Sequence, residues 1–180
     1  KVFEAREERT RPDRDEKILA GWNGLMVSAL ANSKPLDNSD EYIDTAEDAL
    51  GFIRDQLWDG DLLHRRYKDG DVAFEGYLED YAFVARGAFD LYEATGDLEH
   101  LGFSLELTRR ITEEFFDSDD STIYFTSKTR DELVARPQEI NDSSTPSSLG
   151  VALDLLVSLS AFDPDFEEIA EAVLKTHAET

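Results

Sequence analysis

Cysteine is absent from this 180-residue chain. The sequence therefore excludes disulfide bonds, a thiolate nucleophile and any metal site that uses cysteine ligands. An apolar run of 18 residues is also missing, and no apolar, signal-like segment follows Lys1. These two absences predict a soluble protein of the cytoplasm that does not enter a membrane.

Basic residues are scarce, because 18 Lys and Arg stand against 41 Asp and Glu, which gives a formal net charge of −23. Phosphate contacts need a basic patch, so this balance argues against nucleic acid and against an anionic membrane surface as partners. The acidic residues are spread along the chain and form no tail. This distribution favours an acidic, halophilic-type surface suited to a salt-rich cytosol over a dedicated cation-binding protein.

Apolar residues make up 41% of the chain, which is enough for one compact domain over residues 1–180. Their spacing predicts two kinds of helix. Helices that are apolar around most of their circumference, and therefore buried, are predicted over 20–32, 78–95 and 147–160. Helices with one apolar stripe are predicted over 40–57, 98–116 and 166–174.

Short β-hairpins are predicted between the helices, one over 62–70 and one that pairs 123–125 with 133–135. Buried helix, one-sided helix and hairpin thus recur nearly three times. Inner helices ringed by outer helices describe an all-α fold, a partial α/α toroid of about three helical hairpins. Three pairs do not close a ring, so we expect a longer natural chain or two copies that associate through exposed inner helices.

Asp80 is the main candidate for acid–base chemistry. The polar residues of helix 78–95 form one stripe, which consists of Glu79, Arg86, Asp90 and Glu93. Asp80 lies about 100° away from that stripe, in a row of apolar residues. A carboxylate in such a row needs a partner or a raised pKa, as acid–base catalysts have. The alternative is a first-turn carboxylate that complements the helix dipole.

The start of helix 20–32 gathers further candidates. Asp15 is a possible second acid, Asn23 a hydrogen-bond donor, and Trp22 and Tyr77 are stacking surfaces for a sugar-like ligand. The alternatives are a core tryptophan and a turn or cap at Asn23. Glycoside hydrolysis needs two carboxyl groups at a set separation, and Glu79–Asp80 beside Asp15 is the grouping to weigh.

Basic and histidine side chains near the predicted helix entries complete the set. His64 is a possible general base or a simple hairpin residue. Arg65, Arg66 and Arg136 could grip a carboxylate or phosphate, although pairing with the abundant acids is favoured. The three histidines show no metal-ligand spacing, so we predict no metal and no cofactor.

Four motifs resemble a known family: DEKILAGWNGLM at 15–26, GYLEDYAF at 76–83, LVARPQ at 133–138 and TPS at 145–147. Together they are similar to the C-terminal part of a family that includes the spermatogenesis-associated protein 20 group and the bacterial YyaL-like proteins. Its members join a thioredoxin-like domain to an α/α toroid of the six-hairpin glycosidase type. The resemblance covers the chain from Arg11 onward.

The resemblance implies that this chain is roughly half of such a toroid, without the thioredoxin-like domain. Its motif residues, which carry no assigned roles, fall here on Asp15, Trp22, Asn23, Glu79, Asp80, Tyr81, Arg136 and Pro137. The toroid is similar to that of N-acylglucosamine 2-epimerases. The histidine pair expected of those epimerases has no evident match, which argues against epimerase activity.

Two functions follow as hypotheses. The first is a toroid domain that binds or processes a carbohydrate-like small molecule as part of the full-length protein. In it Asp80 and Asp15 are catalytic, and the substrate-binding residues are Trp22, Asn23, Tyr77, Glu79, Tyr81, His64 and Arg136. The second is a non-catalytic scaffold whose partner is a thioredoxin-like domain or another protein.

Overall fold

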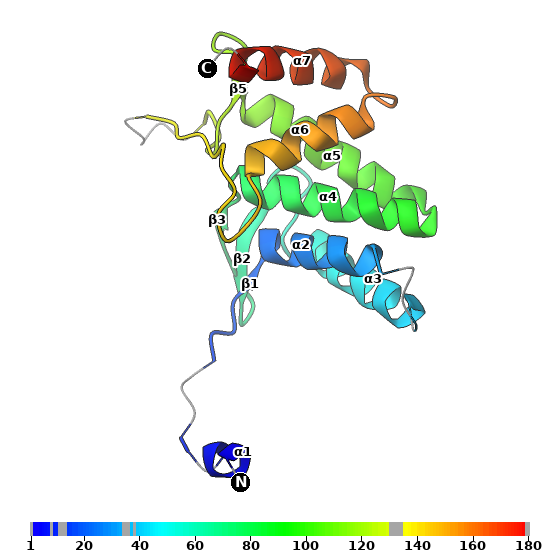
Figure 1. Cartoon of the computed structure of the whole chain (residues 1–180), viewed down its shortest axis with the longest axis vertical. Helices are drawn as coiled ribbons and strands as arrows, with labels where there is room; N and C mark the ends of the chain where they lie inside the picture. Colours follow the sequence, from blue (N-terminus) through cyan, green and yellow to red (C-terminus); the bar gives the residue numbers. More distant parts are fainter. Residues whose placement is uncertain are drawn as a thin grey trace.

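Three antiparallel helical hairpins, α2–α3, α4–α5 and α6–α7, form the body of the chain (Figure 1). The structure, a computed structural model, describes residues 2–7, 9–10, 14–33, 37, 39–129 and 135–178. The helices are α1 (Val2–Glu7), α2 (Ala20–Ala31), α3 (Ser39–Gln56), α4 (Leu78–Thr95), α5 (Leu98–Glu114), α6 (Ser148–Leu159) and α7 (Pro164–Ala178). The short helix α1 lies apart from the three hairpins, at the bottom of Figure 1.

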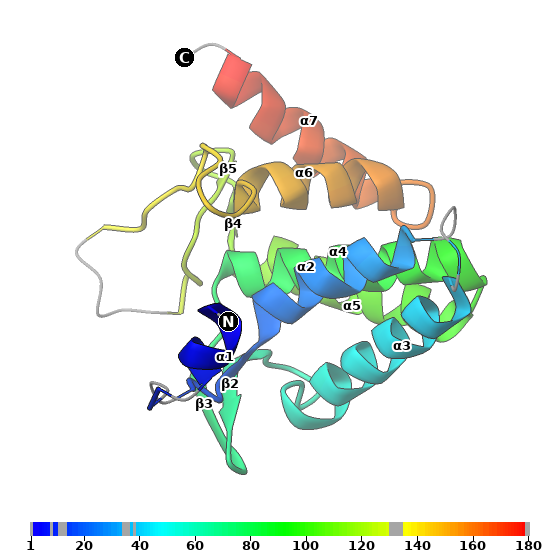
Figure 2. The same ribbon diagram turned by 60° about the horizontal axis from the view of Figure 1, so that its bottom comes forward.

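Helices α2, α4 and α6 lie side by side and begin at the same edge of the molecule, on the left of Figure 1. Each is backed by its hairpin partner, α3, α5 or α7 (Figures 1 and 2). Helix α4 is central, since it packs against α2, α3, α5 and α6, and most of its residues are buried. The predicted alternation of inner and outer helices, and the partial α/α toroid that it describes, are confirmed.

Helix α2 is less buried than its all-round apolar sequence predicts. Trp22 is 62% exposed and Met26 is 57% exposed. Both lie on the same stripe, because they are four residues apart on one helix. The prediction of burial on all sides is therefore wrong for this helix. On α6, Val157 is exposed in the same way.

Helices α2 and α4 cross at two glycines. A Cβ atom added to Gly24 would lie 2.5 Å from backbone atoms of Phe83 and Val84, and one added to Gly87 would lie 2.6 Å from the Gly24 carbonyl oxygen. Real side chains do not tolerate such distances. Gly24 and Gly87 therefore allow the two backbones to approach closely.

A three-stranded antiparallel sheet of β1 (Ile18–Leu19), β2 (His64–Lys68) and β3 (Asp71–Glu75) lies at the entry to α2 and α4. The turn between β2 and β3 places Asp69 at φ 51° and Gly70 at φ 85°, a left-handed region that suits an Asp-Gly pair. The hairpin predicted over 62–70 is confirmed, and it extends to Glu75.

The second β-pair joins β4 (Phe116–Asp117) to β5 (Thr122–Ile123). The sequence predicted that 123–125 would pair with 133–135, but residues 133 and 134 lie outside the described residues. Within the described part, Ile123 pairs with Phe116 across a turn. Gly96, at φ 77°, ends α4, and Asp97 caps α5 by accepting a 2.9 Å hydrogen bond from the Glu99 amide.

Candidate functional site

Four side chains gather where α2 and α4 begin: Arg65, Tyr77, Glu79 and Asp80, which we call the entry cluster. Arg65 comes from β2, Tyr77 precedes α4, and the two carboxylates lie in the first turn of α4. Arg65 Nη1 donates to Glu79 Oε1 at 2.6 Å and to Asp80 Oδ2 at 2.8 Å. One guanidinium nitrogen thus holds two carboxylates side by side.

Asp80 is the buried centre of the cluster and is only 1% exposed. Its Oδ2 also accepts a 3.0 Å hydrogen bond from the Tyr77 amide, and its Oδ1 accepts one of 3.0 Å from the Gly21 amide in α2. Burial raises the pKa of Asp80, while the Arg65 charge and the two amides oppose this rise. The predicted partner for a carboxylate in the apolar row therefore exists, and it joins three segments of the chain.

The local sequence explains why the two helices can meet at this carboxylate. A Cβ atom on Gly21 would lie 3.0 Å from Asp80 Oδ1, so a side chain there would crowd the carboxylate. Gly76 is similarly confined, because a Cβ atom there would lie 2.9 Å from the Leu63 carbonyl oxygen. At the start of α4 the amide of Tyr77, the N-cap residue, lacks a helical acceptor, and the Asp80 carboxylate supplies that acceptor.

The outer side of the entry cluster is partly exposed. The Glu79 side chain keeps 14% of its accessible surface, and Arg65 keeps 25%. The Tyr77 ring stacks on Phe125 with centroids 4.9 Å apart, and the Arg65 guanidinium lies 5.1 Å from the Tyr77 ring centroid. The Tyr77 ring thus contacts two other side chains of the protein, Phe125 and Arg65.

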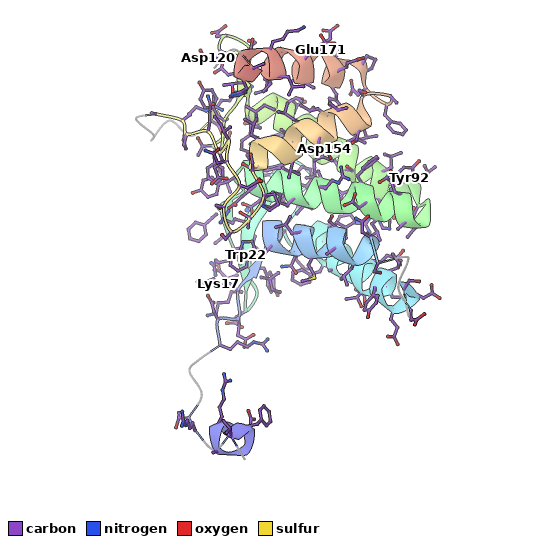
Figure 3. The ribbon with its side chains drawn as sticks, in the orientation of Figure 1. Lys17, Trp22, Tyr92, Asp120, Asp154 and Glu171 are labelled. Atoms are coloured by element: carbon purple, nitrogen blue, oxygen red, sulfur yellow. The ribbon has the colours of Figure 1, made fainter. Side chains whose placement is uncertain are left out.

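The residues predicted around α2 lie at its exposed start. Asp15 pairs with Lys17 at 3.2 Å, and hydrogen bonds from Lys17 lower the Asp15 pKa. Asp15 and Asp80 share no contact among the described residues. Asn23 Nδ2 donates to the Leu19 carbonyl oxygen at 2.8 Å, which stabilises the first turn of α2. Figure 3 shows Trp22 at the start of this helix, close to the strands.

Tyr81 and His64 contact other groups within the fold. The Tyr81 hydroxyl is buried and accepts a 2.8 Å hydrogen bond from the Leu63 amide. Burial raises the pKa of Tyr81 to about 12. His64 Nε2 lies 3.5 Å from Asp59 Oδ2.

Arg136 fastens the loop beside the entry cluster. Its guanidinium donates to the Thr126 carbonyl oxygen and lies 4.2 Å from the Tyr124 ring centroid. Within that loop the Phe125 amide donates to the Pro137 carbonyl oxygen at 2.8 Å, and the Leu78 amide donates to the Phe125 carbonyl oxygen at 2.9 Å. Hydrogen bonds through Phe125 thus connect the Arg136–Pro137 segment to the start of α4.

A second polar group, missed from the sequence, crosses all three inner helices. Ser28 Oγ of α2 donates to Asp90 of α4, and Arg86 Nε donates to the same carboxylate at 2.9 Å. The other side of the guanidinium pairs with Asp154 of α6, which is labelled in Figure 3. We call these four residues the cross-helix network. Two signals were present in the sequence, namely the polar stripe of α4 and the isolated acid of α6.

The described residues offer neither a metal centre nor a membrane span. No group of three or more His, Cys, Asp or Glu side chains in the described ranges could hold a metal ion. Among the helices described, none combines the length and apolar character needed to cross a membrane.

Comparison with known proteins identifies relatives by sequence. The chain is 34% identical over 174 residues to spermatogenesis-associated protein 20 of Homo sapiens, a match that covers 90% of this chain and 22% of that protein. The protein of the same name from Rattus norvegicus is 33% identical over 171 residues, with 88% of this chain and 22% of that protein covered. The chain thus spans about a fifth of the length of these relatives. No protein-family model matches it.

Several solved structures with a similar fold come from enzymes that act on carbohydrates. A family 76 α-mannanase from Bacteroides thetaiotaomicron matches with a TM-score of 0.69 at 15% identity, over 93% of this chain and 46% of that one. Cellobiose 2-epimerase from Bacillus thermoamylovorans matches with a TM-score of 0.74 at 12% identity, over 91% and 45% of the two chains.

A third match is an inactive variant of a Salegentibacter α-1,6-mannanase, with two consecutive aspartates replaced by asparagine, in complex with α-1,6-mannotriose. Its TM-score is 0.66 at 12% identity, over 96% of this chain and 49% of that one. At these identities the likeness establishes the fold. The resemblance predicted from the four motifs is confirmed by the sequence relatives. The chain is therefore related by sequence to spermatogenesis-associated protein 20, and it folds as part of an α/α toroid.

Proposed function

We propose that this chain forms a carbohydrate-binding part of an α/α toroid, with a neutral saccharide bound at the entry cluster. The observation that carries the proposal is the Arg65–Glu79–Asp80 arrangement at the point where two inner helices begin. It offers a fixed donor and a partly exposed acceptor, the pairing that sugar hydroxyls require. The fold shared with a mannanase and a cellobiose epimerase supports this class of ligand.

The geometry favours different roles for the two adjacent carboxylates. Asp80 accepts three hydrogen bonds and is buried, so we assign it to positioning Arg65 and the helix starts. Glu79 keeps accessible surface and is held by the same guanidinium, so it is the carboxylate that contacts the ligand. The inactive mannanase variant, in which two consecutive aspartates are replaced, is a precedent for the importance of such a pair in another protein with this fold.

Trp22 and Asp15 complete the proposed saccharide site. Because the Tyr77 ring already contacts Phe125 and Arg65, the exposed Trp22 is the better stacking platform for a sugar ring. Asp15 has a lowered pKa and is therefore ionised at neutral pH. In this proposal it accepts hydrogen bonds or a proton and does not act as an acid.

Catalysis, in this proposal, belongs to a longer protein with a complete ring. The solved structures with this fold are about twice as long as the part matched here. The remaining helical hairpins, and a thioredoxin-like domain, are the partners that we propose for the chain in an intact protein. We expect the 180 residues alone to bind saccharide without turnover.

A thermal-shift screen with α-1,6-mannotriose and cellobiose tests the proposal. We expect a saccharide to raise the Tm of the chain, and the increase to be lost in Glu79→Gln. The matched control is Glu113→Gln, which changes an exposed glutamate on the outer helix α5.

Asp80→Asn tests the positioning role, because it weakens the hold on Arg65 and is expected to reduce the ligand-induced shift. An unchanged shift in Asp80→Asn would remove Asp80 from the site. No response of the chain to any saccharide would contradict the proposal and favour the non-catalytic scaffold.

A further inference from the structure

A surface cavity of about 230 Å³ lies between α4 and the start of α6, away from the entry cluster. Arg86 lines it from α4, and Gly150, Val151 and Asp154 line it from α6. Asp142, Pro146 and Ser147, which precede α6, complete the wall. None of these residues belongs to the entry cluster, so the cavity is a separate feature.

Arg86 is held in the cavity wall by the buried carboxylate of Asp90. Its Nε donates to Asp90 Oδ1, and Asp90 is only 4% exposed. Asp90 is held in turn by the Ser28 hydroxyl of α2. A buried carboxylate that accepts from both neighbours leaves the guanidinium little freedom, which lowers the entropy lost when a ligand binds.

On its cavity side, Arg86 forms an ion pair that a ligand can partly replace. Its Nη1 pairs with Asp154, whose carboxylate is largely exposed to solvent. An exposed ion pair contributes little to stability, so a ligand hydroxyl can replace one of its contacts at small cost. The Arg86–Asp154 pair therefore offers a donor and an acceptor next to each other.

The charges around the cavity disfavour an anionic ligand. Asp142 and Asp154 would repel an anion, and the whole chain carries a net charge of −23. A molecule with adjacent hydroxyl groups can use the guanidinium as donor and the carboxylate as acceptor, and it adds no charge. Pro146 and Val151 supply an apolar wall for the C–H groups of such a molecule.

The size of the cavity and its place along α4 set the length of the ligand. A volume of about 230 Å³ is below the 300–1,000 Å³ of sites for drug-sized ligands, and suits one sugar ring. Glu79 of the entry cluster and Arg86 are seven residues apart on α4, which corresponds to about 10 Å along the helix axis. Two or three linked sugar units would cover that distance.

We propose that the Arg86 cavity binds one ring of a neutral oligosaccharide whose other end lies at the entry cluster. Arg86 and Asp154 bind adjacent hydroxyls, and Asp90 and Ser28 are positioning residues for Arg86. This inference rests on the proposed function and extends it from a single sugar to a chain of two or three.

Amide chemical shifts of the ¹⁵N-labelled chain, titrated with α-1,6-mannotriose and with mannose, test the inference. We expect mannotriose to shift the amides of Gly150 and Val151 together with those of Gly21 and Tyr77. Arg86→Gln should raise the Kd for mannotriose by about tenfold or more, as expected for the loss of a hydrogen bond to a charged group. Arg109→Gln is the matched control, since Arg109 of the outer helix α5 pairs with Asp163, the residue before α7.

Two further variants separate binding from folding. Asp154→Ala alters an exposed side chain, so it should fold normally and still raise the Kd for mannotriose. Ser28→Ala and Asp90→Asn should each raise the Kd less than Arg86→Gln does. Both changes weaken the hold on Arg86 but leave its guanidinium in the cavity wall. Equal Kd values for Asp154→Ala, Arg86→Gln and Arg109→Gln would overturn the inference.

The pattern of shifts distinguishes the two proposals. Shifts confined to the Gly21 and Tyr77 amides would refute the cavity and leave the proposed function in place. Shifts confined to Gly150 and Val151 would support the cavity and contradict binding at the entry cluster. The absence of shifts with both sugars, at millimolar concentrations, would contradict both.

Discussion

Asp80 joins three segments of the chain through one carboxylate. It holds the start of α2 through Gly21, the strand β2 through Arg65 and the approach to α4 through Tyr77. Buried polar groups stabilise a fold only when their hydrogen bonds are satisfied, and this one has three donors. The same arrangement that fixes the helix starts also fixes the Glu79 and Arg65 side chains that we assign to the ligand.

Tyr81 provides a test of buried polar contacts one residue away. Its hydroxyl accepts from the Leu63 amide, and Leu63 is fully buried. Tyr81→Phe removes the acceptor and leaves a buried N–H without its partner. We expect the free energy of unfolding at pH 7 to fall by about 1–3 kcal/mol, measured by urea denaturation. Tyr42→Phe, on the exposed face of α3, is the control and should change it by less than about 0.5 kcal/mol.

The raised pKa of Tyr81 predicts a loss of stability in alkali. The pKa is about 12 in the folded chain and about 10 in an unfolded chain. The folded state therefore holds the proton more tightly, and this contribution is fully present below pH 10 and is lost as the pH rises through 12. Between those values the free energy of unfolding should fall by roughly 1.4 kcal/mol per pH unit more in the native chain than in Tyr81→Phe. Equal slopes for the two proteins would contradict the burial of this hydroxyl.

The crossing of α2 and α4 depends on glycine at two positions. The distances at Gly24 and Gly87 leave no room for a side chain on either helix. A crossing this close brings the Gly21 amide to Asp80 and Ser28 to Asp90, so both polar groups depend on it. The helix propensity lost at each glycine is thus offset by the contacts that the close approach allows.

Gly24→Ala should force the two helices apart. Its Cβ atom would overlap backbone atoms of Phe83 and Val84, which cannot rotate away, so we expect a loss of about 1–3 kcal/mol in the free energy of unfolding. Gly102→Ala on α5 is the matched control, because a Cβ atom there meets nothing within 4 Å. That change should stabilise the chain by about 0.5–1 kcal/mol. A neutral effect of Gly24→Ala in urea denaturation would show that the crossing is looser than described.

Helix periodicity predicts the elements better than it predicts their surroundings. The bounds of α4 match the predicted 78–95, because an apolar pattern over five turns has one clear period. The same pattern on α2 could not reveal that Trp22 and Met26 stay exposed, since burial depends on which helices are present to cover them. Asp90 could not be separated from the exposed acids of its stripe, because its burial comes from Ser28 and Arg86 on either side.

The candidate site was predictable in part from its residue types. A carboxylate in an apolar row must find a partner, so a buried contact for Asp80 followed from the sequence. The sequence did not identify Arg65 as that partner, because the contact depends on how β2 lies against the start of α4. For Asp15 the sequence was less informative, because its place in a motif did not predict its contact with Lys17.

The net charge of −23 should make the stability of the whole chain depend on salt. Like charges repel in the compact state, and this repulsion is screened at high ionic strength. We expect the Tm to rise between 0.1 and 2 M KCl, with each kcal/mol gained adding about 2–4 °C. Near pH 4, where carboxyl groups titrate, the same increase in KCl should have a smaller effect. A Tm that falls with KCl at pH 7 would contradict a repulsive acidic surface.

Exposed apolar side chains on the inner helices predict that the chain associates with itself. Trp22 and Met26 lie on α2 and Val157 on α6, the two helices that flank the central helix α4 (Figure 1). Because similar toroids contain about twice this length of chain, a second copy turned by half a revolution could supply the missing half of the ring. Mutual repulsion of two acidic chains opposes this contact, so salt should promote it.

Sedimentation equilibrium tests the association directly. We expect the dimer fraction to rise with chain concentration and with KCl, and Met26→Gln to raise the dimer Kd by about tenfold, because it places a polar group in an apolar contact. Leu174→Gln changes an apolar residue of the outer helix α7 that is also about half exposed, and it should leave the Kd unchanged. Equal effects of the two substitutions would place the contact elsewhere. A difference confined to Met26→Gln would assign the uncovered face of the inner helices to ring closure, the arrangement that three hairpins alone cannot reach.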